Sequence, residues 1–190
     1  MTLIIVISLI LIIFSVLWIF LWGWFFKLNN SAFIRLQEIG TKAFEKGNYK
    51  KAKELLIRAL NKKGDFDLKL QLGISHLNLR EYKEAQKVFE QLLIQKPDNA
   101  NLIINLITTL IKQGLFQNTL EMCNEILTNK PDDTAIMLKK AEIYYAKNEI
   151  EKALETTQLV DNLSPENKDA GILKLKCKSE MHDPDNTEEY

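Results

Sequence analysis

The stretch Gly47-Asn48-Tyr49-Lys50-Lys51-Ala52 decides the fold, because its pattern returns three more times along the 190-residue chain. The position of Tyr49 is occupied again by Tyr82, Phe116 and Ile150, at intervals of 33, 34 and 34 residues. An interval of this length, kept by several columns of residues, indicates a chain built from internal repeats.

Five further columns keep the interval. In chain order they hold Ala52, Ala85, Thr119 and Ala153; Leu56, Phe89, Cys123 and Thr157; Ala59, Leu92, Ile126 and Val160; Gly40, Gly73, Ile107 and Ala141; and Pro97, Pro131 and Pro165. Together these columns resemble the tetratricopeptide repeat, a helix-turn-helix unit of 34 residues. The departures from that pattern are local, such as Gly64 in place of the first proline and Ile150 in place of an aromatic ring.

The resemblance gives each column a physical role. Small residues let the two helices of a unit approach closely, the aromatic residue fills the wedge between them, and proline ends the second helix. Gly47, Gly114 and Asn148 fall in the turn within a unit, where a left-handed backbone is often needed. We therefore predict an all-α solenoid of about four repeats.

The predicted solenoid extends over residues 33–167, and the sequence indicates further segments after it. The four units are 33–65, 66–99, 100–133 and 134–167. Residues 168–181 place apolar residues among lysines and are expected to form a fifth, partial unit that acts as a capping helix, since a terminal repeat needs a polar outer face. Residues 182–190 are acidic, contain Pro184 and lack apolar periodicity, so we expect a disordered tail.

The N-terminal part of the chain has a different composition. Residues 3–26 form an uncharged, apolar run, and about 20 such residues suffice to cross a bilayer as a helix. The run ends in Trp22, Trp24, Phe25 and Phe26 before Lys27, an arrangement typical of the membrane interface. We predict a single transmembrane helix at 3–26, after residues 1–2 and before a linker at 27–32.

Two other interpretations of this run fit less well. A cleaved signal peptide would have a basic region first and small residues at its cleavage site, whereas here only Met1 and Thr2 precede the run and bulky aromatic residues end it. A buried core helix of this length would carry some polar positions. Because Lys and Arg occur only after the run, the positive-inside rule predicts an external N-terminus and a cytoplasmic repeat domain.

The remaining sequence argues against catalysis. The chain holds 25 basic and 25 acidic residues, a balance that disfavours nucleic-acid binding. Cys123, Cys177, His76 and His182 are isolated from one another, so neither a zinc site nor a catalytic pair is expected. We find no phosphate-binding loop and predict no enzyme activity, cofactor, metal or small-molecule substrate.

In the family that the chain resembles, the first helices of successive units line a concave groove that binds peptides or helices. The residues at the corresponding groove positions are Gln37, Thr41, Phe44, Leu70, Ile74, Leu77, Asn101, Ile104, Thr108, Ile111, Leu138 and Tyr145. One subgroup clamps a C-terminal carboxylate with basic residues, but Gln37, Thr41, Asn101 and Asn105 stand in those places here. The groove is mostly apolar, which suits an amphipathic partner helix. The alternative is that some of these side chains merely pack between helices.

Two functions remain open from the sequence. The first is a membrane-tethered adaptor or scaffold that binds a protein partner in the groove. The second is a structural or assembly subunit of an integral membrane complex, which also contacts partners through the transmembrane helix. The run at 3–26 lacks a small-xxx-small pattern, and this mildly favours simple anchoring.

Overall fold

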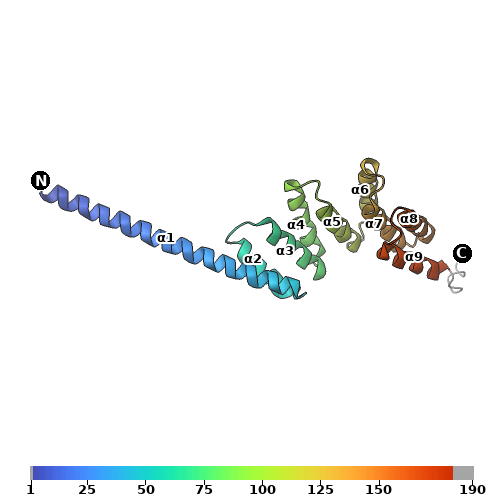
Figure 1. Cartoon of the computed structure of the whole chain (residues 1–190), viewed down its shortest axis with the longest axis horizontal. Coiled ribbons are helices and arrows are strands. Elements are labelled where there is room, and N and C mark those ends of the chain that lie inside the picture. Colours follow the sequence, from blue (N-terminus) through green and yellow to red (C-terminus); the bar gives the residue numbers. More distant parts are fainter. Residues whose placement is uncertain (1, 182–190) are drawn as a thin grey trace. The chain divides into compact units, whose positions relative to one another are not determined.

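The computed structural model describes the backbone of residues 2–181, and the side chains of 13–181 except 26, 28 and 29. The predicted tail at 182–190 lies outside the described residues. All regular elements within 2–181 are helices (Figure 1), which confirms the all-α helical repeat. They are α1 (Thr2–Glu45), α2 (Tyr49–Leu60), α3 (Phe66–Asn78), α4 (Tyr82–Gln95), α5 (Ala100–Lys112), α6 (Phe116–Asn129), α7 (Thr134–Ala146), α8 (Ile150–Leu163) and α9 (Lys168–Met181).

The chain divides into two compact units, of which the first holds α1–α3 and the second α4–α9. In the first unit α2 packs along the C-terminal part of α1, and α3 packs on α2. Gly40 lies at this contact: a Cβ added there would lie 3.4 Å from the Cβ of Leu55 and 3.4 Å from Cδ2 of Leu56, at the near limit of ordinary van der Waals contact. Leu56 and Leu68 are buried in the core of this unit, and the rings of Phe44 and Tyr49 meet edge to face at 5.8 Å.

Helix α1 runs without a break through residues 27–32, which we expected to be a linker. The stretch from Lys27 to Ala32 contains no proline or glycine, so nothing in it ends a helix. The predicted span at 3–26 includes residues 3–12 and 26, whose side chains lie outside the described part of the chain. Within the part of the chain that is described, no helix is long and apolar enough to cross a membrane.

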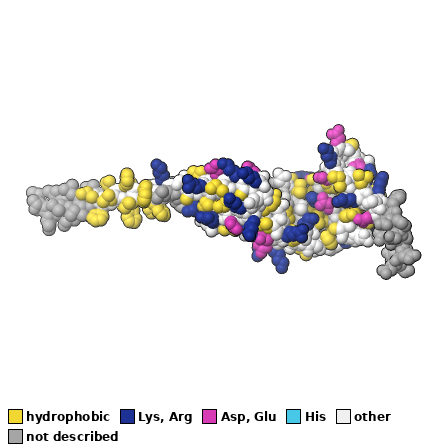
Figure 2. Space-filling view, turned by 90° about the horizontal axis from the view of Figure 1, so that it is seen from below, with side chains coloured by type: hydrophobic (Ala, Val, Ile, Leu, Met, Phe, Trp, Pro, Cys, Tyr) yellow, Lys and Arg dark blue, Asp and Glu magenta, His cyan; other side chains and the backbone are white. Residues whose placement is uncertain are grey.

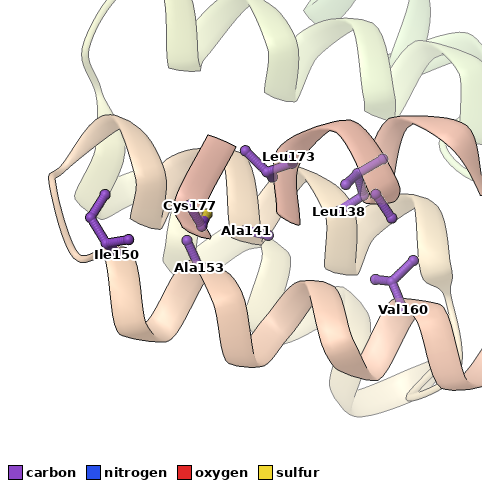
Figure 3. Close-up of a cluster of buried hydrophobic side chains, with 8 residues drawn as sticks. Leu138, Ala141, Ile150, Ala153, Val160, Leu173 and Cys177 are labelled. Atoms are coloured by element: carbon purple, nitrogen blue, oxygen red, sulfur yellow. The ribbon is translucent and has the colours of Figure 1, made fainter. Parts of the chain in front are cut away.

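In the second unit the repeat columns form the core. Ala85, Ala153, Phe89 and Cys123 have no exposed surface. Figure 3 shows a cluster within this core, where side chains from α7, α8 and α9 meet, among them Ala141, Ala153 and Cys177. In the column that holds Tyr82 and Phe116, the three aromatic residues are partly buried, whereas Ile150 is buried.

Polar residues within the core satisfy their hydrogen bonds locally. The hydroxyl of Thr119 donates to the carbonyl oxygen of Leu115 at 2.5 Å, and that of Thr157 donates to the carbonyl oxygen of Leu154 at 2.8 Å. Thr119 can therefore stand in the column of Ala52, Ala85 and Ala153, and Thr157 in the column of Leu56, Phe89 and Cys123, without leaving an unpaired group.

Side-chain caps set the start of each first helix from α3 onward. The side-chain oxygens of Asp65, Asn99, Asp133 and Asn167 accept from the backbone N–H three residues later, at 3.0–3.1 Å. These four residues are spaced by 34, so they form a further repeat column. Capping of this kind is worth about 1 kcal/mol per helix.

The turn inside each repeat holds one residue with positive φ. These residues are Gly47 (φ 72°), Arg80 (61°), Gly114 (77°) and Asn148 (61°). The prediction for Gly47, Gly114 and Asn148 is thus confirmed. Arg80 adopts the same left-handed conformation although its side chain disfavours it.

Candidate functional site

The second unit contains a cleft of about 380 Å³ between α5, α7 and α9. Helix α5 packs against α7, and α7 against α9, so the three helices form its walls. Ile111, Leu138 and Leu173 line the cleft with apolar surface, whereas Lys112, Glu142, Asp169 and Lys176 provide charges of both signs. A cleft of this kind fits an apolar side chain that is flanked by polar groups.

Three of the predicted groove residues lie together in this cleft: Ile111 of α5, and Leu138 and Tyr145 of α7. Leu138 is only 8% exposed and belongs to the core as well. At this position the alternative interpretation, packing between helices, applies in part. Asn101 is exposed, and Ile104 and Thr108 are half-buried, but these three α5 residues do not line the cleft.

The other predicted groove residues belong to the first unit. Gln37, Thr41, Phe44, Leu70, Ile74 and Leu77 are all half-buried. Thr41 on α1 donates a hydrogen bond to the side chain of Gln71 on α3, at 3.1 Å. Phe44 packs against the core of this unit. These contacts place Thr41 and Phe44 partly in the structure of the unit, and whether the six residues bind a partner stays a prediction.

Helix α9 contributes a wall of the cleft that the repeat columns alone did not predict. It supplies Asp169, Ile172, Leu173 and Lys176. Ile172 lies 34 residues after Leu138, and Lys176 lies 34 residues after Glu142, so α9 is in register as the first helix of a fifth unit. That interval is the signal in the sequence that could have found this wall.

Two polar side chains of the cleft, Glu142 and Tyr145, contact charged neighbours. Lys139 Nζ lies 2.9 Å from each carboxylate oxygen of Glu142, so this charge is neutralised from its own helix. The hydroxyl of Tyr145 donates a hydrogen bond to Glu180 on α9. This hydrogen bond, together with desolvation, raises the pKa of Tyr145 above its ordinary value of 10.0.

The described residues offer no group of three or more His, Cys, Asp or Glu side chains that could hold a metal ion. Both cysteines are buried free thiols. Burial raises the pKa of the Cys123 thiol to about 11, which keeps it protonated and unreactive at neutral pH.

Comparison with known proteins identifies the fold. Residues 43–108 and 110–177 match the family model described as Tetratricopeptide repeat, and these stretches cover most of the chain. The chain belongs to the tetratricopeptide repeat family. This TPR assignment includes most of α9, in agreement with its place as the start of a fifth unit.

Solved structures agree with this fold. One described as YrrB, a TPR protein with an unusual peptide-binding site, has a TM-score of 0.66 at 21% identity, and the match covers 80% of this chain and 77% of that one. A MamA fragment from Desulfovibrio magneticus RS-1 has a TM-score of 0.60 at 18% identity, over 84% and 98%. TTC0263, a thermophilic TPR protein from Thermus thermophilus, has a TM-score of 0.62 at 16% identity, over 79% and 83%. No curated protein matches the chain in sequence. At these identities the likeness shows the fold alone.

Proposed function

We propose that this TPR protein is a membrane-tethered adaptor that binds a partner helix or peptide in the cleft between α5, α7 and α9. The observation that carries the proposal is the exposed apolar side chain of Ile172, which is 54% exposed beside Leu173 and Leu138. An exposed apolar residue at the mouth of an apolar cleft is a common anchor point for a partner side chain. The mixed charges around it suit an amphipathic segment.

The tether is supported by the N-terminal run. On α1 the large apolar side chains of 13–25 are exposed, from Leu17 at 52% to Phe20 at 75%. Figure 2 shows them as a hydrophobic stretch of helix, whereas charged side chains lie over the repeats. Helical surface that is apolar on all sides needs an apolar environment. The flanking charges favour a repeat domain on the cytoplasmic side.

The tether and its orientation are tested on membranes that hold the full chain. Alkaline washing should leave the chain in the pellet, and protease added outside intact cells should leave the repeats uncut. Release by alkali would contradict an embedded helix. Cleavage of the repeats in intact cells would reverse the orientation.

The cleft is tested with a photoreactive amino acid in the full chain. One version carries it at Ile172 and a matched version carries it at Leu175, which is on the same helix and 68% exposed but does not line the cleft. We expect a discrete cross-linked partner from position 172 and none from 175. Equal cross-linking from both positions would show that the cleft has no special part in binding.

If the partner is captured instead from α1, the protein acts as a subunit of an integral membrane complex. A photoreactive residue at Trp18 tests this directly, because that side chain is 69% exposed on α1. Cross-linking to another membrane helix from position 18, with none from 172, would replace the adaptor proposal.

A further inference from the structure

Charge is distributed unevenly along a chain whose net charge is zero. Residues 27–63 carry ten Lys and Arg against three Asp and Glu, whereas residues 64–190 carry fifteen against twenty-two. The basic excess therefore lies entirely in the first repeat and the residues that lead into it, directly after the apolar run. In Figure 2 dark blue Lys and Arg side chains gather next to the hydrophobic stretch of α1.

The fold brings part of this charge back toward the apolar run. Helix α1 continues away from residues 13–25 and ends at Glu45, and α2 then returns along it (Figure 1). The C-terminal end of α2 therefore lies beside the start of the repeat in α1. A cavity of about 640 Å³ at this end is lined by Ser31, Ala32, Arg35, Leu36, Arg58 and Lys62. The nearby Lys63 Nζ lies 5.7 Å from the centre of the Phe33 ring.

This end of the hairpin is within reach of a bilayer surface. Ser31 follows Phe25 by six residues, or about 9 Å along a helix, and Arg35 follows it by about 15 Å. The headgroup layer on each side of a bilayer is about 5–8 Å thick, and the Debye length at physiological salt is about 8 Å. Arg and Lys extend their charged ends several ångströms further. Arg35, Arg58 and Lys62 are all exposed.

We propose that Arg35, Arg58 and Lys62 form a binding surface for the anionic phospholipid headgroups of the membrane that holds α1. The inference rests on the tether proposed above. Continuity of one helix from the apolar run into the cavity favours a lipid surface over a soluble polyanion, because the surface is then already adjacent. The end of α2 carries the negative pole of its helix dipole, and Arg58 in its last turn offsets it.

The same hairpin supplies a matched control. Lys46, Lys50 and Lys51 are also exposed, but they lie at the opposite end, around the turn between α1 and α2. Changing either set of three to Gln removes the same charge from the same repeat. The two variants differ in the distance of the removed charges from the apolar run and in residue type, since the first set holds two Arg and one Lys and the second holds three Lys.

The experiment uses the full chain in phosphatidylcholine vesicles and its own fluorescence. All three tryptophans, Trp18, Trp22 and Trp24, lie in the apolar run, so energy transfer to a lipid with an acyl-chain acceptor reports the lipid beside it. We expect about a 10-fold preference for labelled phosphatidylserine over labelled phosphatidylcholine. The preference should fall to about 2-fold or less in R35Q/R58Q/K62Q and in high salt, and persist in K46Q/K50Q/K51Q. Circular dichroism checks that both variants keep their helices.

Each other outcome overturns the proposal in a distinguishable way. Equal transfer to both lipids in the wild-type chain would leave the tether standing and remove the lipid surface. Loss of preference in the K46Q/K50Q/K51Q control alone would place the lipid contact at the other end. Competition by millimolar inorganic phosphate, or by an RNA oligonucleotide at matched ionic strength, would assign the cluster to a soluble anion or to RNA. Absence of transfer to either lipid would refute the tether, and the lipid surface with it.

Discussion

The hydroxyl of Tyr145 on α7 donates a hydrogen bond to the carboxylate of Glu180, 35 residues later on α9. This bond connects the fourth repeat to the helix that completes the cleft. It ties α9 to α7, and both helices line the same cleft.

Replacing Tyr145 by Phe removes this bond and keeps the ring. Because both side chains are partly exposed, we expect a loss of about 0.5–1 kcal/mol in the free energy of unfolding. The pKa of Tyr145 is raised in the folded chain, so the bond stabilises the fold from neutral pH up to the unfolded pKa of about 10. This contribution is lost as the pH rises through the higher folded pKa. Urea melts should therefore show the difference between wild type and Y145F at pH 8 and its disappearance in strong alkali; a difference that grows with pH would contradict the assignment.

Phe89 tests the repeat register. Its side chain on α4 has no exposed surface, and Phe89→Ala should cost about 3–5 kcal/mol. Ile94 lies on the same helix and is 83% exposed, so Ile94→Ala is the control and should cost less than about 0.5 kcal/mol. Comparable losses in chemical denaturation would mean that the buried face of α4 is misplaced.

Arg80 carries backbone strain that glycine would relieve. Its φ of 61° lies in the left-handed region, at the turn position held by Gly47 and Gly114 in other repeats. Arg80→Gly should stabilise the fold by about 0.5–1 kcal/mol. This is the relief of strain minus the cost of the conformational entropy that glycine adds to the unfolded chain. Gly47→Ala should destabilise the fold because alanine disfavours this positive φ, although a Cβ there meets no atom within 4 Å. A lower melting temperature for R80G would refute the strain.

The Cys123 thiol should be protected from alkylation in the folded chain. Burial raises its pKa to about 11, so iodoacetamide at pH 8 should modify it only as fast as the chain opens. Mass spectrometry of the tryptic peptide gives the rate, and labelling in urea gives the unprotected rate. Rapid modification without denaturant would show that α6 does not pack as described.

The repeat columns predicted the core because burial follows the helix period, and a residue spaced by 34 returns to the same environment. Ala52, Ala85 and Ala153 are all fully buried, as that reasoning requires. The groove was harder to predict. Leu138 and Ile104 follow the same period whether they face a partner or a neighbouring helix, so spacing cannot separate the two. The packing of α9 shows that Leu138 belongs to the core and also lines the cleft.

Other features depended on information that the pattern lacks. An arginine with positive φ cannot be read from the repeat, because nothing in the residue type requires that conformation. Arg58 and Lys62 line one cavity with Arg35 because α1 and α2 form a hairpin, although both residues lie more than 20 positions after Arg35 in the sequence. The role of α9 was detectable in principle from the interval between Leu138 and Ile172.

The central claim is that the cleft between α5, α7 and α9 binds a protein segment. The most direct test uses the partner that cross-linking from position 172 identifies. Its affinity is compared for full chains that carry Ile172→Glu or Leu175→Glu. Both residues are exposed on α9, so neither change should lower the melting temperature by more than about 1–2 °C. We predict at least about a 10-fold weaker affinity for I172E, because an anchor residue that a partner buries is typically worth more than 1 kcal/mol of binding free energy. We predict wild-type affinity for L175E. Equal affinities in the two variants would contradict the claim.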